Sequence, residues 1–303
     1  MIKSDKRRCK LKTGFVTLIG RPNSGKSTLI NTLMNQKIVI VSDKPQTTWH
    51  SINCIYTDDL AQIVFTDTPG IHKVINNVNR YMMKAVGEAL EGMDLIVWVI
   101  DVTKGLSKGE DYVFEKIKDI KKSTLILLNK IDLLDKNKIK HYSNLLQNKY
   151  APDGLLAISA KDYQSREQIL ERIRQFLSDG PLLYPPEMLT DRSNKFIVSE
   201  IIREKIFRLT YEEIPYSCAV FVEHFSDEED GKLVIRAEIW VERKTQKGMI
   251  IGKDAKTIKK IRIKAKKDIQ YLFDRPVELE LYVRVKKDWR QKDYLLNDDL
   301  YFS

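Results

Sequence analysis

One short segment near the start of the chain limits its fold more than any other. Residues 20–27, GRPNSGKS, match the pattern GxxxxGKS and lie between an apolar run, FVTLIG, and a helical pattern, KSTLINTLM. In a strand–loop–helix of this kind, successive backbone N–H groups and the helix N-terminus surround a β-phosphate. Lys26 can offset charge on the β- and γ-phosphates, and Ser27 can bind Mg²⁺. The segment therefore predicts a P-loop nucleotide site.

The rest of the first half alternates short apolar runs with helical patterns. The runs LIVWVID and TLILLNK are apolar throughout, which is typical of parallel strands covered by helices on both faces. The pattern predicts an α/β P-loop NTPase domain with a doubly wound, mostly parallel sheet. We expect strands at 15–20, 61–67, 95–101, 124–130 and 155–159, and helices at 79–91, 108–121 and 166–177.

A proline-rich stretch separates this domain from a second one. Pro181, Pro185 and Pro186 interrupt any helix there, so we interpret the stretch as a linker. The order that follows, α-β-β-α-α-β, predicts an α+β domain: helix 194–209, strands 217–225 and 232–244, a short helical piece, a longer helix and strand 277–285. The expected divisions are a basic arm (1–12), the nucleotide domain (13–178), the linker (179–193), the second domain (194–290) and a tail (291–303).

Three further motifs follow expected strands of the nucleotide domain. In DTPG, Asp67 can hold Mg²⁺ through a water, and the Gly70 N–H can reach a γ-phosphate. In NKID, the Asp132 carboxylate can accept from N1–H and the 2-amino group of guanine, which adenine lacks. A backbone N–H of the turn Ser159-Ala160-Lys161 can meet guanine O6. The expected nucleotide-binding residues are Gly20, Arg21, Pro22, Asn23, Ser24, Gly25, Lys26, Ser27, Thr28, Asp67, Thr68, Pro69, Gly70, Asn129, Lys130, Asp132, Ser159, Ala160 and Lys161.

The four motifs, each at the end of an expected strand, resemble a Ras-like GTPase domain, and a GTPase also needs a mobile threonine that senses the γ-phosphate and Mg²⁺. Thr48, in the stretch SDKPQTT, is our choice, with Thr47 as the alternative. Ile71 stands where related enzymes often carry a water-orienting glutamine, so we expect slow intrinsic turnover. Asn23 resembles the residue that helps to hold a monovalent cation in some bacterial GTPases, and our hypothesis is that it holds a K⁺ ion that stimulates turnover; otherwise it only caps the loop. The expected catalytic residues are Lys26, Thr48, Asp67, Gly70 and Asn23, and the expected metal ligands are Ser27, Thr48 and Asp67.

Charge is concentrated in the second domain. The chain has 52 Lys and Arg against 42 Asp and Glu, a formal net charge of +10. Residues 243–292 alone hold 17 Lys or Arg against 6 Asp or Glu, which favours a polyanionic partner at this place. The three cysteines form no CxxC pair, which argues against a zinc site or a disulfide framework and fits a reducing cytosol. No apolar run approaches the roughly 20 residues of a membrane helix.

The stretch IIGKDAKTIKK, at 250–260, has the features of an RNA-clamping loop. Such a loop reads Gly-x-x-Gly between two helices, but here Ala255 replaces the second glycine. We expect Ala255 to begin the next helix, where alanine costs little, and Asp254 to act as an N-terminal acid of that helix. The alternative is the solvated face of a basic helix. The expected RNA-binding residues are Arg243, Lys247, Ile250, Ile251, Gly252, Lys253, Asp254, Ala255, Lys256, Lys259 and Lys260.

Together these motifs resemble a known family over nearly the whole chain. The first domain resembles Ras-like GTPases, and the second resembles type II KH domains. The pieces GRPNSGKSTLIN, VSDKPQTT, IYTDDLAQIVFTDTPGIHK, QKGMIIGK and VRVKKDWR are similar to the Era family of bacterial GTPases. A departure from that family is Trp49-His50, where similar sequences usually carry Arg after PQTT.

The resemblance implies a GTPase that uses GTP, GDP and Mg²⁺. It implies binding of the KH domain to the 3′ end of small-subunit (16S) ribosomal RNA, and a role in 30S subunit assembly and RNA maturation. It also implies a cytoplasmic protein with peripheral contact to the inner face of the cell membrane, and we expect a monomer. The alternative function is a GTP-dependent membrane- or protein-partner switch, in which the C-terminal domain is a docking module. A constitutive RNA binder with a vestigial nucleotide site is a third interpretation, disfavoured by the intact motifs.

Overall fold

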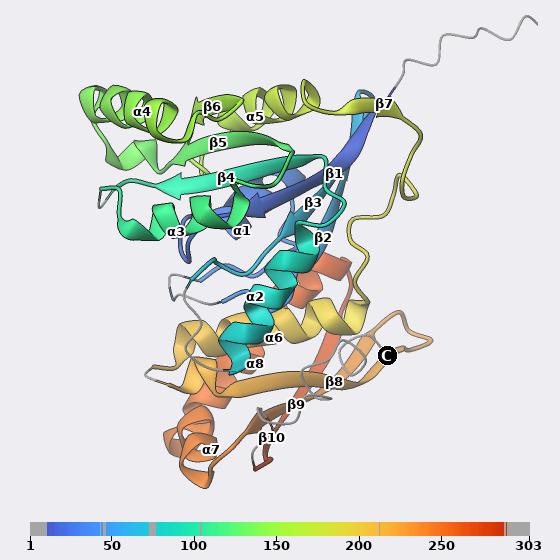
Figure 1. Ribbon diagram of the computed structural model, residues 1–303. Coiled ribbons are helices and arrows are strands. Elements are labelled where there is room, and N and C mark those ends of the chain that lie inside the picture. Colours follow the sequence, from blue (N-terminus) through green and yellow to red (C-terminus); the bar gives the residue numbers. More distant parts are fainter. Residues whose placement is uncertain are drawn as a thin grey trace, which may run out of the picture. The chain divides into compact units, whose positions relative to one another are not determined.

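A computed structural model shows the fold of the chain (Figure 1). The structure describes residues 11–42, 44, 47–72, 77–103, 105–211, 213–287 and 289. The chain forms two compact units. The first consists of residues up to Ile38, Thr48–Val74 and Met82–Asp191, and the second consists of Arg192 onward together with the short segments Val39–Thr47 and Ile75–Tyr81.

The first unit is built on a mostly parallel sheet. The strand order is β2-β3-β1-β4-β5-β6; β2 pairs with β3 in antiparallel fashion and the other neighbours along this path are parallel. The strands are β1 (Leu11–Ile19), β2 (Ile52–Thr57), β3 (Ala61–Asp67), β4 (Leu95–Asp101), β5 (Ser123–Asn129), β6 (Gly154–Ala157) and β7 (Ser178–Gly180). The helices are α1 (Lys26–Met34), α2 (Asn77–Ala89), α3 (Lys108–Ile117), α4 (Lys136–Tyr150) and α5 (Ser165–Arg174), with a 3₁₀ turn at Ile131–Leu133. Of α2, the part from Met82 onward belongs to this unit. The doubly wound α/β fold is confirmed.

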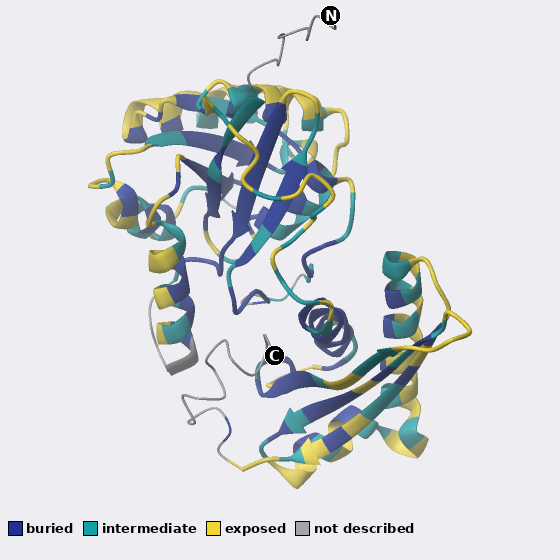
Figure 2. Cartoon of the chain, turned by 90° about the vertical axis from the view of Figure 1, so that its right-hand side faces the viewer, coloured by how far each residue is buried: buried dark blue, intermediate teal, exposed yellow. Residues whose placement is uncertain are grey.

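The strands β3, β4 and β5 of this sheet are buried over most of their length because helices cover both sides of the sheet (Figure 2). Alternate residues of β4, namely Ile96, Trp98 and Ile100, join one core with buried residues of α2, α3 and α4. Leu95, Val97 and Val99 point to the opposite face, since successive side chains of a strand alternate. On that face α1 and α5 pack against each other. The P-loop and the other strand ends are thereby fixed on a rigid frame.

Several boundaries differ from the expectations. β1 begins at Leu11, inside the expected basic arm, because Leu11–Thr13 pair with β7 in antiparallel fashion. The expectations omitted β2, β7 and α4: β2 and β7 are short strands of six and three residues, and α4 has a weakly amphipathic, lysine-rich pattern. The expected arm at 1–10 and the tail at 291–303 lie outside the described residues.

The linker is docked onto the first unit rather than extended in solvent. Gln62 of β3 is fully buried; its Nε2 donates to the Tyr184 carbonyl at 2.9 Å, and its Oε1 accepts from the Leu183 and Tyr184 N–H groups. The Ile55 N–H donates to the Leu189 carbonyl at 2.9 Å. The stretch after β7 therefore follows the edge of the sheet, and the division into units falls at Asp191, inside the expected linker.

The second unit has the α-β-β-α-α-β order that the sequence predicts. Its elements are α6 (Asn194–Leu209), β8 (Cys218–Asp227), β9 (Leu233–Val241), α7 (Lys244–Ile251), α8 (Lys256–Phe273) and β10 (Val277–Val285), with 3₁₀ turns at Ile214–Tyr216 and Lys253–Ala255. β8 and β9 form an antiparallel pair, and β10 is parallel to β9. α6 packs against β8 and α8. Ile261, Ala265 and Ile269 supply the buried stripe of α8.

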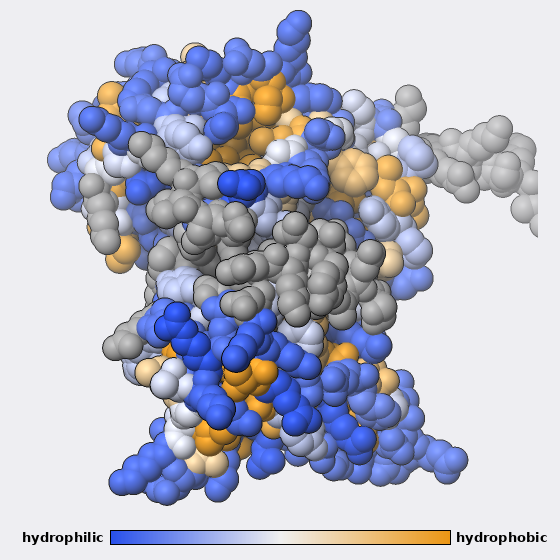
Figure 3. Space-filling model, turned by 60° about the horizontal axis from the view of Figure 1, so that its bottom comes forward, coloured by the Kyte–Doolittle hydropathy of each residue, from blue (hydrophilic) through white to orange (hydrophobic). Residues whose placement is uncertain are grey.

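The described part of the face shown in Figure 3 is mainly polar. Hydrophilic residues cover most of it, and hydrophobic residues occupy smaller areas. Among the described helices, none combines the length and the apolar character that crossing a bilayer requires.

Candidate nucleotide and RNA sites

The P-loop connects β1 to α1 and depends on glycine at one position above all. Gly25 has φ of 104°, and a Cβ placed there would lie 2.2 Å from Asn129 Nδ2. Asn129 is itself buried and donates from Nδ2 to the Ser24 carbonyl at 2.8 Å. The loop and the NKID motif are therefore packed directly on each other, with no room for a side chain between them.

Lys26 is buried inside the P-loop. Its Nζ donates to the carbonyls of Gly20 at 3.2 Å and Arg21 at 3.3 Å. Burial lowers the pKa of Lys26 to about 8, although the negative charge of Asp67 opposes this shift. Phosphates brought against the ammonium would favour its charged form and raise the pKa again. Lys26 is thus the cation that the P-loop motif predicts, held in a site where it is only half protonated near pH 8.

This pKa leads to a measurable proton uptake. In the free protein Lys26 has a pKa of about 8, so about half of the molecules carry the proton at pH 8. Because bound phosphates raise this pKa, nucleotide binding at pH 8 should be accompanied by uptake of about half a proton. Calorimetric titration with GTP, in two buffers of different ionisation enthalpy, measures this quantity. At about pH 6.5, where Lys26 is already charged, the uptake due to Lys26 should be close to zero. Equal uptake at both pH values would contradict the prediction.

The three expected metal ligands lie together at the end of the P-loop. Ser27 Oγ donates to Asp67 Oδ2 at 2.7 Å, and Thr48 Oγ1 lies 3.4 Å from both of these oxygens. Asp67 is fully buried. One carboxylate and two hydroxyls are hard oxygen donors of the kind that Mg²⁺ prefers, with waters and phosphate oxygens completing its coordination. The donor set fits a magnesium–nucleotide site.

The structure separates the two threonine candidates of the switch segment. Thr48 Oγ1 faces the Asp67 and Ser27 oxygens, whereas Thr47 Oγ1 donates to the Lys44 carbonyl at 2.8 Å. The Thr47 hydroxyl is therefore used within its own loop. Thr48 remains our prediction for the γ-phosphate sensor. Asp43, Pro45 and Gln46 of the same stretch lie outside the described residues.

The residue after DTPG takes no part in the phosphate site. Ile71 is 2% exposed and belongs to the core between the sheet and α2. Its N–H donates to the Gly20 carbonyl at 2.9 Å, which ties DTPG to the P-loop. Gly70 lies so close to this loop that a Cβ would be 2.5 Å from the Pro22 nitrogen. The side chain at position 71 thus cannot orient water, which agrees with slow intrinsic turnover.

The base-binding end is organised by Asn129. Its Oδ1 accepts from the N–H groups of Lys130 and Ala160, both at 2.8 Å, so NKID and the Ser159-Ala160-Lys161 turn are held together. Ala160 N–H is used in this contact, and the expected hydrogen bond from the turn to guanine O6 stays a prediction. Asp132 is exposed in the 3₁₀ turn Ile131–Leu133, where its carboxylate is open to a base.

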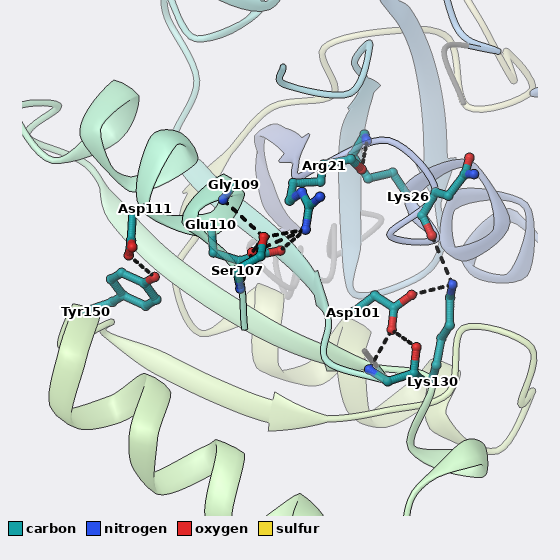
Figure 4. Close-up of polar contacts among 11 residues, drawn as sticks. Arg21, Lys26, Asp101, Ser107, Gly109, Glu110, Asp111, Lys130 and Tyr150 are labelled. Carbon is teal, nitrogen blue, oxygen red and sulfur yellow. Dashed lines mark hydrogen bonds and ion pairs between the residues drawn. The ribbon is translucent and has the colours of Figure 1, made fainter. Parts of the chain in front are cut away.

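Lys130 links the same end back to the P-loop (Figure 4). Its Nζ donates to the Asn23 carbonyl at 3.0 Å and pairs with Asp101 Oδ2 at 2.5 Å. Burial opposes ionisation of Asp101, but hydrogen bonds from Lys130 and Thr103 together hold its pKa below the ordinary value. Asp101 was absent from our expected site. It could have been predicted, because it ends the buried strand β4 and the other nucleotide motifs also follow strand ends.

A second missed contact involves Arg21, which we expected only as a phosphate-loop residue. Arg21 Nη1 donates to Ser107 Oγ at 2.7 Å and pairs with the buried Glu110 at 3.2 Å (Figure 4). Ser107 and Glu110 form a capping box at the start of α3. The side chain of Arg21 therefore fastens the P-loop to α3, while its carbonyl accepts from Lys26.

In the second unit, the expected clamp loop is a tight left-handed turn between α7 and α8. Gly252 has φ of 72°, and a Cβ there would lie 2.2 Å from Thr257 Oγ1. Asp254 and Ala255 have φ of 52° and 57°. Our expectation for these two residues was wrong: α8 begins at Lys256, Ala255 precedes it in the left-handed region, and Asp254 lies before the first turn of α8. Ala255, which replaces the second glycine of the Gly-x-x-Gly pattern, thus has the backbone conformation that glycine adopts most readily.

Ala255→Gly should therefore stabilise the protein. A left-handed alanine costs roughly 1–2 kcal/mol, and the greater freedom of glycine in the unfolded chain removes part of the gain. We expect the free energy of unfolding to rise by up to about 1 kcal/mol in urea denaturation of the full chain. Ala265→Gly, in the helical and buried part of α8, is the matched control and should lower it by about 1 kcal/mol or more. Destabilisation by Ala255→Gly would show that the loop does not hold this conformation.

The remaining expected RNA contacts divide into exposed cations and supporting residues. Ile250 is fully buried, so its side chain supports the loop from beneath, and Ile251 and Lys247 are half-buried. Met249, 48% exposed beside the loop, was not among the expected residues. The exposed members of the predicted set are Arg243, Lys253, Asp254, Lys256, Lys259 and Lys260. Lys253, Lys256, Lys259 and Lys260 are exposed cations at the turn and the start of α8, which favours contact with a nucleic-acid backbone; Asp254 adds a carboxylate that lies 3.8 Å from Lys256 Nζ.

Comparison with known proteins matches both units. Residues 15–130 match the family model described as 50S ribosome-binding GTPase, and residues 213–290 match the KH domain model. The GTPase Era of Thermotoga maritima is 45% identical over 96% of this chain and 97% of its own length. The GTPase Era of Halothermothrix orenii is 42% identical over 94% of this chain and 97% of its own length.

Two solved structures are similar over nearly the whole chain. One is Era in complex with MgGDPNP and nucleotides 1506–1542 of 16S ribosomal RNA, with a TM-score of 0.90, 32% identity and coverage of 96% of this chain and 98% of that one. The other is a variant of Aquifex aeolicus Era bound to GDP·AlF₄⁻, with a TM-score of 0.89, 33% identity and coverage of 96% and 99%.

Proposed function

The chain belongs to the GTPase Era family, and from that membership we propose that it is a GTP-controlled RNA-binding protein of small-subunit assembly. Its enzymatic activity is hydrolysis of GTP to GDP and phosphate, with Mg²⁺ as cofactor. Its partner is the 3′ end of 16S ribosomal RNA, bound by the KH domain, within the 30S subunit. The observation that best supports GTP binding and hydrolysis is that Ser27, Thr48 and Asp67 lie together beside the P-loop.

Each residue of the nucleotide site has a task in this proposal. Ser27, Thr48 and Asp67 would hold Mg²⁺, which would neutralise negative charge on the nucleotide's phosphates. Lys26, once protonated, adds a positive charge on the same phosphates. The Gly70 N–H donates to the γ-phosphate, and the Asp132 carboxylate selects guanine. Loss of the γ-phosphate removes the partner of both Thr48 and Gly70, so these two residues report which nucleotide is bound.

The proposed binding of RNA by the KH domain is supported by the exposed cations around the left-handed turn. The test is RNA affinity as a function of salt. A protein that neutralises several phosphates loses affinity steeply as salt rises, with a slope close to the number of contacts. The KH proposal predicts such a slope, reduced by about one for Lys253→Ala or Lys259→Ala. Salt-independent or absent RNA binding would instead support the alternative, in which the C-terminal domain docks a protein or membrane partner.

We also propose that K⁺ stimulates hydrolysis. The buried Ile71 supplies no group that could stabilise developing charge, and the exposed Asn23 lies on the P-loop with φ of 63°. A monovalent cation held there would act as an arginine finger does in other GTPases. We expect kcat to be at least about tenfold higher in KCl than in NaCl at equal ionic strength, and Asn23→Ala to abolish the difference. Equal rates in the two salts would contradict this role.

The cytoplasmic location, the peripheral membrane contact and the monomeric state belong to the same proposal. They come from the family resemblance, and each has a direct measurement: cell fractionation, co-sedimentation with vesicles, and sedimentation velocity.

A further inference from the structure

The helix that follows the clamp loop, α8, has an exposed face of its own. α8 packs on α6 and β10 and buries Ile261, Ala265 and Ile269. Residues three and four positions apart lie on the same face of a helix, so the opposite side of α8 also forms one row. All six residues of this row are exposed, and we call it the outer stripe: Lys256, Lys260, Ile263, Lys264, Lys267 and Tyr271.

The outer stripe concentrates positive charge that the second unit does not neutralise. α8 contains seven Lys or Arg but a single acidic residue, Asp268, which pairs with Lys205 of α6. Among the described residues, Lys260, Lys264 and Lys267 take part in no ion pair. The positive charge of the stripe is therefore open to a partner.

Like charges at this spacing are unfavourable for the helix itself. Lys264 lies four residues after Lys260 and three before Lys267, and like-charge pairs at these distances destabilise a helix. The lysine-rich helix α4 differs, because its Lys138 pairs with Asp135. A row of unpaired lysines thus costs stability in the free protein, and a polyanion that lies along the row removes this cost.

The outer stripe begins where the clamp loop ends. Lys256 is the first residue of α8 and directly follows the turn at residues 252–255. From Lys256 to Tyr271 the stripe is about 22 Å long, at 1.5 Å per residue. A KH clamp grips about four nucleotides, so a longer RNA continues beyond it. The stripe adjoins the loop on the side where such an RNA can continue along α8.

The two uncharged residues of the outer stripe indicate the kind of partner. The side chain of Tyr271 is 84% exposed, and an exposed aromatic ring beside cations is a stacking surface for an unpaired base. The other uncharged residue is Ile263, which is 64% exposed. A helix that lies on a membrane turns a broad apolar face to the lipid, whereas the apolar face of α8 is buried inside its own domain. The composition of the stripe therefore favours single-stranded RNA over a lipid surface.

We propose that the outer stripe is a second RNA-binding surface, which holds the single-stranded RNA that adjoins the nucleotides in the clamp loop. Lys264 and Lys267 contact phosphates of this RNA, and Tyr271 stacks on one of its bases. The inference rests on the proposed binding of RNA by the KH domain and extends it to a longer RNA. It makes affinity depend on RNA length beyond the roughly four nucleotides that the clamp itself holds.

The experiment measures fluorescence anisotropy with the full chain in one nucleotide state and two single-stranded RNAs. One RNA has about five nucleotides, enough to fill the clamp, and the other has about 20 and contains the same five. Lys264→Ala combined with Lys267→Ala should weaken binding of the long RNA roughly tenfold. It should also reduce the slope of log affinity against log salt by about 1.4, since each contact with a single strand accounts for about 0.7. The short RNA should bind this double variant as it binds the unsubstituted protein.

Tyr271 provides a test of stacking that is independent of charge. Tyr271→Ala should weaken binding of the long RNA at least about fivefold, and Tyr271→Phe should keep most of the affinity because the ring remains. Pairing the part of the long RNA beyond the clamp with a complementary strand should remove the effect of Tyr271→Ala, since its bases are then no longer free to stack. An effect that persists on the paired RNA would contradict the stacking role.

The matched control removes two lysines from another exposed helix. Lys136→Ala combined with Lys140→Ala, on α4 of the first unit, lowers the net charge equally and should leave the affinity for the long RNA unchanged. The Lys264/Lys267 double variant relieves repulsion within α8, so its melting temperature should be unchanged or higher.

The outcomes separate this inference from the proposed RNA function. If the short RNA binds, and neither the double variant nor Tyr271→Ala changes the affinity for the long RNA, the KH proposal stands and the second surface is wrong. An equal loss for short and long RNA would assign these residues to the clamp loop or to the fold. If the unsubstituted protein binds neither RNA, the RNA function fails and the inference falls with it. Loss of binding to anionic lipid vesicles in the double variant, with RNA affinity unchanged, would show that the stripe docks on a membrane.

Discussion

Gly25→Ala should abolish tight nucleotide binding. The new methyl group would lie 2.2 Å from Asn129 Nδ2, on a backbone with φ of 104° that alanine rarely adopts. Asn129 cannot move away without losing hydrogen bonds that join Ser24, Lys130 and Ala160. Backbone strain and one broken buried hydrogen bond together amount to roughly 3 kcal/mol, which corresponds to a loss of affinity of about 100-fold.

Titration of GDP and GTP in parallel measures this effect. Both nucleotides should be affected equally, because the altered loop binds the β-phosphate that they share. Gly87→Ala is the matched control: a Cβ at this position in α2 meets nothing within 4 Å, and it should leave both affinities unchanged. Wild-type affinity in Gly25→Ala would mean that the loop and NKID are not packed as described.

Asp132→Asn should exchange guanine for xanthine. The Asp132 carboxylate is proposed to accept from N1–H and from the 2-amino group of guanine. In the substituted protein the amide N–H meets the guanine amino group, donor against donor, whereas xanthine offers a carbonyl oxygen at that position. A site built for one hydrogen-bonding pattern rejects the wrong base strongly, so we expect GTP to bind roughly 1,000-fold more weakly and xanthosine triphosphate to bind more tightly than GTP. Competition between the two nucleotides for the substituted protein measures the exchange.

The exposed position of Asp132 separates an effect on base selection from an effect on folding. Its side chain is exposed in a 3₁₀ turn, so the substitution should leave the fold and the melting temperature unchanged. Asp135→Asn removes a carboxylate three residues away, where asparagine can still cap α4, and should have no effect on base choice. Unchanged GTP affinity in Asp132→Asn would remove Asp132 from the guanine site.

Much of this architecture could be predicted because local signals agreed with the global fold. Apolar runs such as those of β4 and β5 indicate buried strands of a parallel sheet. Because the carboxyl ends of such strands meet at one edge of the sheet, the four nucleotide motifs that follow them lie close together. The helix at Asn194–Leu209 and the strand at Val277–Val285 begin and end where their patterns predict. Periodicity was sufficient wherever one face of an element is buried.

The errors occurred where tertiary contacts override local preference. Nothing in the letters GKDA shows that Ala255 is left-handed, because alanine after a turn normally begins a helix; the turn is set by Gly252 and the packing of α7 and α8. The contacts of Arg21 with Glu110 and of Arg203 with Thr47 join residues 89 and 156 positions apart, and no short-range pattern encodes them. Such pairs become visible only when the fold brings them together.

The central claim is that the nucleotide controls RNA binding. The most direct measurement is fluorescence anisotropy of a single-stranded RNA with the 16S 3′-end sequence, against a scrambled RNA, with the protein loaded with GDP or with a non-hydrolysable GTP analogue. We expect sequence-specific binding that is tighter in the analogue form by about tenfold, a common size for coupling between two sites. Equal affinity for the RNA in the two nucleotide forms would contradict the claim, and the C-terminal domain would then act independently of GTP.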